Sequence, residues 1–140
     1  MGYRSEVLLA IAFADKAHRD EALAVYAMHP LVQKHDLLKE WKQHDYEDGE
    51  THIYCLWFSD DHVKWYESYE DVQGYEYMSQ VAADFSENRD FPYAWIKYRL
   101  GENYDDTEVE ELDDDKDGAL RDYLWDMCSI QRSIRNEFDQ

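Results

Sequence analysis

The chain has 140 residues, the usual size of one domain, and a formal net charge of −19. A domain of this length buries about two-thirds of its unfolded surface, so it needs no disulfide or metal to hold it together. Apolar residues make up 44% of the sequence and aromatic residues 16%, which excludes a disordered composition. The longest apolar run, 7–14, is too short for a membrane-spanning helix, which needs about 20 residues.

The negative charge restricts the kind of partner. Its magnitude is several times the value of about 2–8 that suits a small domain, and such self-repulsion destabilises the compact state. The same field repels nucleic acid and anionic membranes, so we expect neither as a direct ligand. The charge therefore indicates adaptation to high salt or, as we expect, attraction of a basic surface.

The cysteine content indicates a reducing compartment. Cys55 and Cys128 are the only cysteines and lack a paired spacing, and the first four residues show no apolar segment of the signal-peptide kind. We therefore predict two buried thiols in a soluble cytoplasmic protein.

The sequence of the first half of the chain predicts a strand, a helix and two further strands, in that order. Residues 3–13 form an uninterrupted apolar run after a short polar start, typical of a central strand covered on both faces. Asp15 stands where an N-cap is expected, and the helical spacing that follows predicts a helix over 15–28, after which Pro30 can open a short second turn. Residues 36–46 and 51–58 predict a hairpin around the turn 47–50, with its second strand covered on both faces.

The second half completes a recognisable order of elements. Apolar residues at intervals of three and four predict a long helix over 68–85, and residues 93–100 resume strand character. The resulting β-α-β-β-α-β order predicts an α+β protein with a ferredoxin-like core, its helices on one face of the sheet. Without a linker-like stretch, we expect one domain over 1–140, with 102–117 as an acidic loop or hairpin extension within it.

The tail is ambiguous from periodicity alone. Its apolar residues between 120 and 138 fit a helix, whereas Leu124, Cys128 and Ile134 also fall on one face of a strand. Asp126 interrupts that strand face. Both a C-terminal strand and a C-terminal helix therefore stay open.

Nearly all of the net charge lies in one contiguous half. Residues 45–117 hold 23 acidic and 5 basic side chains, a net charge of −18, and 102–117 alone carries −9. If Asp106, Glu108 and Glu110 lie on a strand, they project from one face about 6.7 Å apart. Such a row resembles a nucleic-acid backbone, in which duplex DNA presents one charge per ~1.7 Å. We therefore predict acidic mimicry of nucleic acid; the alternative is a solvated tract that only maintains solubility.

Aromatic side chains alternate with carboxylates over 65–76, a combination that suits recognition of arginine and lysine by cation–π contact and ion pairing. The rings can instead anchor the second long helix to the sheet, which we favour for Trp65 and Tyr69, leaving Tyr66 and Tyr75 as surface candidates. The predicted partner-binding residues are Tyr66, Glu67, Glu70, Asp71, Glu76, Glu102, Asp105, Asp106, Glu108, Glu110, Glu111, Asp113, Asp114 and Asp115.

Motifs for catalysis are missing from the sequence: it has no nucleophile elbow, no helical zinc motif and no glycine-rich phosphate loop. We therefore predict no catalytic residue, no cofactor and no enzyme activity. Asp113, Asp115, Asp117 and Gly118 match the opening of a calcium loop, but its twelfth position is Leu124 where a bidentate glutamate is needed. We interpret the segment as an acidic turn and predict no metal site, with weak calcium binding as the alternative.

Three stretches, MGYRSEV at 1–7, KWYESYEDV at 64–72 and GENYDDTE at 101–108, resemble a family of small acidic proteins found largely in bacteriophages and prophages. Members begin MGYRS(D/E)V and carry a KWYxxY(E/D)DV block. The resemblance implies a viral accessory gene. It also implies that the C-terminal segment is a strand rather than a helix, which we expect to pair beside residues 93–100.

The resemblance also implies an anti-defence function, because small, highly acidic phage proteins often block restriction enzymes or CRISPR effector complexes at their DNA-binding surfaces. We therefore expect a phage-type inhibitor that acts in the host cytoplasm. It would bind the basic nucleic-acid-binding surface of a host defence protein, chiefly through 102–117 and with support from 66–76. The alternative is a structural or housekeeping phage protein whose acidic tract is solubilising or binds calcium weakly.

Overall fold

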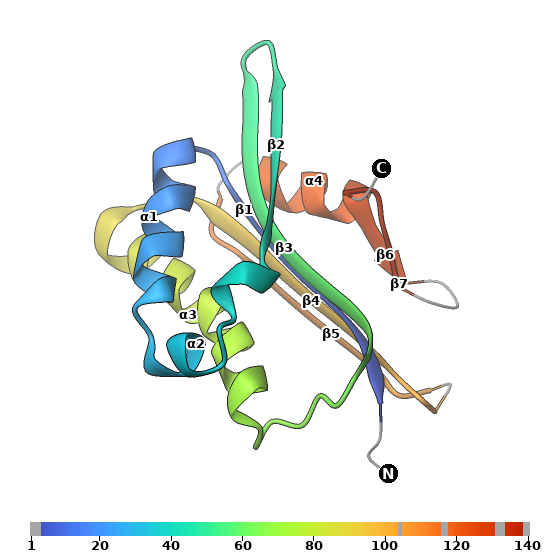
Figure 1. Ribbon diagram of the computed structural model, residues 1–140. Coiled ribbons are helices and arrows are strands. Elements are labelled where there is room, and N and C mark those ends of the chain that lie inside the picture. The colour runs from blue at the N-terminus through green and yellow to red at the C-terminus, as the bar shows by residue number, and fades with distance from the viewer. Residues whose placement is uncertain (1–3, 104, 116–117, 131–133, 139–140) are drawn as a thin grey trace.

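Five antiparallel strands form the main sheet of the protein, in the order β2-β3-β1-β4-β5. The computed structural model describes residues 4–103, 105–115, 118–130 and 134–138. Helices and a small second hairpin cover the sheet, which gives a single α+β domain (Figure 1). The strands of the main sheet are β1 (Ser5–Phe13), β2 (Lys42–Asp48), β3 (Thr51–Val63), β4 (Tyr93–Gly101) and β5 (Thr107–Asp113).

The centre of the sheet is β1, as its apolar sequence predicts. Its side chains from 7 to 13 are fully buried and alternate between two cores. Leu9 and Ile11 face one core, whereas Leu8 and Ala10 face the other. A strand with no polar face is stable only between two covering layers. The prediction that β1 and the apolar part of β3 are covered on both faces is therefore confirmed.

The first face of the sheet is covered by α1 (Lys16–Ala27), α2 (Pro30–Lys34) and α3 (Glu70–Arg89). The Asp15 carboxylate accepts a hydrogen bond from the Ala17 backbone N–H at 2.8 Å, so the predicted N-cap of α1 is confirmed. Gly74 in α3 allows the segment that follows α2 to approach closely. A Cβ at this position would lie 2.5 Å from Leu37 Cδ1, so any larger residue would displace that buried side chain.

The second face carries α4 (Ala119–Met127), followed by the short hairpin of β6 (Cys128–Ile130) and β7 (Ile134–Asn136). The predicted C-terminal strand beside residues 93–100 is wrong, because β5 pairs there and the tail begins with a helix. Leu120 and Leu124 are one helical turn apart and pack into the second core. The expectation that helices cover only one face of the sheet is also wrong, because α4 covers the second face.

Both thiols lie in this second core, as predicted from the sequence. Burial raises the pKa of Cys128 to about 12 and raises the pKa of Cys55 further, because a thiolate is poorly solvated there. Neither thiol is therefore activated at neutral pH. Within the described residues, no helix combines the length and the apolar character that a membrane crossing requires.

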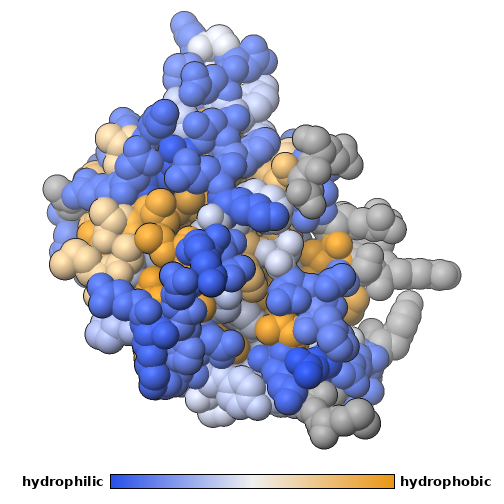
Figure 2. Space-filling model, viewed as in Figure 1, coloured by the Kyte–Doolittle hydropathy of each residue, from blue (hydrophilic) through white to orange (hydrophobic). Residues whose placement is uncertain are grey.

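The β2–β3 hairpin projects beyond the rest of the sheet (Figure 1). Its first strand begins at Lys42 rather than at Asp36, because a turn of 3₁₀ helix, Leu38–Glu40, intervenes. Hydrophilic residues cover the hairpin and much of the same face of the molecule (Figure 2). At the base of the hairpin, the buried Arg19 of α1 forms an ion pair with Asp45, which ties the hairpin to the first helix.

Candidate functional site

The acidic segment supplies an edge of the main sheet. Among the described strands, β5 has a single sheet neighbour, β4, and four of its seven residues are acidic while none is basic. Successive side chains point to opposite faces. Glu110 accepts a hydrogen bond from Trp95 Nε1 at 2.9 Å on the α3 side, whereas Asp113 contacts Arg121 of α4 at 3.4 Å on the other. Of the three residues expected to share one face of a strand, Glu108 and Glu110 do so, whereas Asp106 precedes β5, which begins at Thr107.

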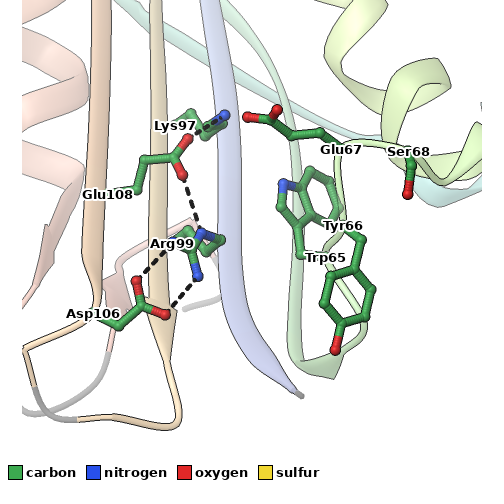
Figure 3. Close-up of a pocket in the computed structure, with 8 residues that line it drawn as sticks. All are labelled: Trp65, Tyr66, Glu67, Ser68, Lys97, Arg99, Asp106 and Glu108. Carbon is green, nitrogen blue, oxygen red and sulfur yellow. Dashed lines mark hydrogen bonds and ion pairs between the residues drawn. The ribbon is translucent and has the colours of Figure 1, made fainter. Parts of the chain in front are cut away.

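Two basic residues of β4 lie directly opposite these carboxylates. Lys97 Nζ pairs with Glu76 of α3 and with Glu108 Oε1, the latter at 2.6 Å. Arg99 contacts Glu108 Oε2 at 3.2 Å and Asp106 Oδ1 at 2.9 Å (Figure 3). These five residues form what we call the Lys97–Arg99 network. Part of the acidic row expected to face a partner is therefore directed at cations of the same chain.

Three members of the network, Lys97, Arg99 and Glu108, are held in their charged forms. Burial alone would lower the pKa of Lys97, but hydrogen bonds to Glu108 and Glu76 outweigh it and leave that pKa raised. Burial would raise the pKa of Glu108, yet Lys97 and Arg99 together hold it below its ordinary value. The hydrogen bond to Asp106 is the largest cause of the raised pKa of Arg99. Glu108 is therefore ionised at neutral pH, where it pairs with both cations.

We expect Glu108→Gln to lower the free energy of unfolding at pH 7 by about 1 kcal/mol, a small value because the Glu108 side chain is 39% exposed. The folded pKa lies below the ordinary 4.5, so the carboxylate contributes stability above about pH 4.5 and loses it as the pH falls further. Urea unfolding at pH 7 and pH 3 measures this, with Glu87→Gln, an exposed site on α3, as control. An equal cost at both pH values would contradict the prediction.

Other predicted partner-binding carboxylates support the fold of the chain itself. Glu70 contacts Lys34 at 2.7 Å and His35 at 3.4 Å, and the hydrogen bond to Lys34 is the main cause of its lowered pKa. Glu67, Asp105 and Glu111 have exposed side chains. The carboxylates of Glu102, Asp114 and Asp115 accept hydrogen bonds from Arg4, Ser86 and Leu120. Those of Asp71 and Asp113 accept from backbone N–H groups within two residues.

The calcium-like motif divides its carboxylates between different partners. Asp113 contacts Arg121, whereas Asp115 accepts from the Leu120 backbone N–H at 3.2 Å at the start of α4. Asp117, like positions 104 and 116 of the acidic segment, lies outside the described residues. Within the described part of the chain, no three histidine, cysteine or acidic side chains converge as a metal site would require.

A pocket of about 490 Å³ opens between β4–β5 and the loop that precedes α3, a volume typical of small-molecule sites. In Figure 3 the loop side chains lie across the pocket from the Lys97–Arg99 network. Eight residues line it: Trp65, Tyr66, Glu67, Ser68, Lys97, Arg99, Asp106 and Glu108.

The division of the aromatic residues near this pocket into buried and exposed rings differs from the expectation based on the sequence. Trp65 is buried as expected, with ring centroids 6.3 Å from Phe58 and 5.8 Å from Tyr75. The expected surface position of Tyr75 is wrong, because its ring stacks on Phe58 inside the first core. The expected anchoring of Tyr69 is also wrong: it is 40% exposed because α3 begins only at the next residue.

The sequence-based site omitted Lys97 and Arg99, although the strand pattern contained a signal for them. The two cations stand two residues apart on a predicted strand, so they share one face, and they lie in a half of the chain with only five basic residues. Two like charges on a half-buried face require counter-charges from a neighbouring strand. The acidic run that follows in sequence is where these counter-charges come from.

Comparison with protein-family models, with curated proteins and with solved structures finds no match to the chain. The resemblance to phage proteins therefore rests on the three short stretches alone. Two of them, 64–72 and 101–108, supply six of the eight residues that line the pocket. The geometry of the acidic edge and of the pocket is the basis for a functional proposal.

Proposed function

We propose that the protein binds a basic, nucleic-acid-binding surface of another protein through the β5 edge and competes there with DNA or RNA. The observation that carries this proposal is the exposed edge strand itself, with four carboxylates, no basic residue and, among the described strands, no sheet neighbour other than β4. The edge thus offers unpaired main-chain groups together with carboxylates on both faces of the strand.

The Lys97–Arg99 network supports the proposal through preorganisation. Asp106 and Glu108 are held by cations of the same chain, so their side chains lose little further freedom when a partner binds. Each carboxylate can accept several hydrogen bonds, which leaves room for arginine or lysine of a partner. The net charge of −18 over 45–117 would steer a basic partner toward this region and make association salt-dependent.

The target class that these features favour is a basic groove built for nucleic acid, as in a CRISPR effector complex or a restriction nuclease. The resemblance to phage proteins supports the same target, in the cytoplasm of a bacterial host. We propose a binding role without catalysis, in which the protein excludes nucleic acid by occupying its surface.

We further propose that the core is ferredoxin-like. The succession β1, α1, β2, β3, α3, β4 and the sheet order β2-β3-β1-β4 support this assignment, as does the position of α1 and α3 against the same core. In this description β5, α4 and the β6–β7 hairpin are additions to the core. The acidic edge then belongs to an addition rather than to the core itself.

The test is capture of proteins from a bacterial lysate on immobilised protein, followed by elution with a 30-base-pair duplex and identification by mass spectrometry. The edge variant is Asp105→Asn/Glu110→Gln/Glu111→Gln. The matched control, Asp61→Asn/Glu87→Gln/Asp90→Asn, removes the same charge at exposed sites elsewhere. We expect DNA-binding proteins that the duplex releases, with recovery reduced about tenfold by the edge variant and unchanged by the control. The proposal would be contradicted if the duplex does not release the captured proteins, or if the two variants capture them equally well.

One observation favours the second candidate function, a structural or housekeeping protein with a solubilising acidic tract. Charged side chains on an edge strand also prevent pairing with other chains. In that case neither variant nor wild type would capture a DNA-binding protein, and calorimetry with calcium would decide whether the acidic turn binds the ion.

A further inference from the structure

The pocket beside β5 contains the donor group of a buried indole ring. Trp65 is 8% exposed, and among the described residues its Nε1–H has no hydrogen-bond partner. Figure 3 shows this nitrogen on the side of the ring that faces Glu67 and Lys97, toward the interior of the pocket. A buried donor that makes no hydrogen bond costs free energy, so this position favours a ligand that brings an acceptor.

The charge of the pocket favours a cation as well. Lys97 and Arg99 line it together with three carboxylates, Glu67, Asp106 and Glu108, so the lining carries a formal charge of −1. Both cations are already paired within the network, which weakens their attraction for an anion. Glu67 is exposed at the rim, and Tyr66 is a second residue of the same loop that lines the pocket.

A ligand for this pocket must therefore combine a hydrogen-bond acceptor with a positive charge. A peptide residue with a basic side chain has both, since its backbone carbonyl accepts and its side chain is charged. Guanidinium fits better than ammonium for two reasons: it is planar and pairs with carboxylates through two parallel hydrogen bonds, and it stacks on aromatic rings. It is also more weakly hydrated, so placing it in a pocket costs less.

We propose that the pocket binds one arginine of the partner, with a backbone carbonyl on Trp65 Nε1–H and the guanidinium against Glu67 and the network carboxylates. This inference rests on the proposed function, because it names the residue by which the basic partner is anchored. The pocket lies beside β5, so a chain that follows the acidic edge can place a side chain in it.

The test uses N-acetyl-arginine N-methylamide as the probe and the Trp65 indole N–H signal in a nitrogen–proton correlation spectrum as the readout. The neutral isostere N-acetyl-citrulline N-methylamide keeps the carbonyl and removes the charge. We expect a saturable shift of the Trp65 signal with arginine in the millimolar range and at least about tenfold weaker binding of citrulline. Glu67→Gln should weaken arginine binding about fivefold, whereas Glu87→Gln should not.

Trp65→Phe assigns the signal and removes the donor, and Glu67→Gln covers the case in which loss of the indole disturbs the packing. The inference would be overturned if inorganic phosphate shifts the Trp65 signal and the arginine probe does not, or if neither compound shifts it. In the lysate capture, loss with the edge variant but not with Glu67→Gln or Trp65→Phe would overturn it while the proposed function stands. Arginine binding without any duplex-released protein would support the pocket and contradict the proposed function.

Discussion

Lys97→Met is expected to lower the free energy of unfolding at pH 7 by about 2–4 kcal/mol. The Lys97 side chain is 6% exposed, and its ammonium is the common partner of Glu76 and Glu108. Methionine fills a similar volume but leaves two carboxylates facing each other without a cation between them. The expected cost lies below that of breaking a fully buried pair, because both carboxylates retain partial contact with solvent.

Denaturant unfolding at pH 7 measures the effect, and Lys39→Met is the matched control. Lys39 also pairs with a carboxylate, Asp36, but its side chain is 65% exposed, so a cost below about 1 kcal/mol is expected. The triple change Lys97→Met/Glu76→Gln/Glu108→Gln should recover part of the loss, because no unpaired charge remains. A Lys97→Met protein as stable as wild type would show that the network contributes nothing to folding.

Leu124→Ala is expected to cost about 2–5 kcal/mol, the range for removing a buried leucine side chain. Leu124 is fully buried in the second core, where α4 covers β1 and β4. The substitution leaves a cavity that the rigid sheet beneath cannot close. The effect therefore measures how firmly α4 is part of the folded domain.

Trp125→Ala is the control for this substitution, because it removes a larger side chain from the next position of the same helix. Trp125 is 44% exposed and its ring lies 4.8 Å from the Arg121 guanidinium. We expect a cost below about 1 kcal/mol, as for other exposed contacts of this kind. Equal losses for the two variants would contradict the assignment of Leu124 to the core.

The elements with a strong local signal were predictable from the sequence. α1 has an N-cap and ends before a proline, and β1 has a run of apolar residues too continuous for a surface helix. These features act within a few residues and do not depend on the rest of the fold.

β5 and α4 were not predictable in the same way. β5 is an edge strand whose seven residues include only Val109 and Leu112 as large apolar side chains, so it shows no apolar face. The apolar residues of the tail fit both the period of a helix and the period of a strand. The strand pairing in the rest of the sheet decides which of the two forms. Because β5 occupies the free edge of β4, the tail has only the uncovered second face of the sheet to pack against.

The candidate site was predictable in its charge but not in its contacts. The acidic segment and the aromatic loop were both identified, yet the sequence does not show that β4 brings two cations between them. The errors on Tyr69 and Tyr75 have different origins. Tyr69 falls outside α3, because the helix begins at Glu70 rather than at Ser68. Tyr75 stands three residues from both Val72 and Met78, so it shares the buried face of α3 with them.

The projecting β2–β3 hairpin offers a practical handle for studying this protein. Its base is tied to α1 by the ion pair between Arg19 and Asp45, while its turn reaches Gly49, which has a φ of +60° and open space around it. Exposed turns of this kind tolerate inserted residues. A short peptide tag inserted beside Gly49 would therefore mark the direction of the hairpin in images of a complex without touching either core, the acidic edge or the pocket.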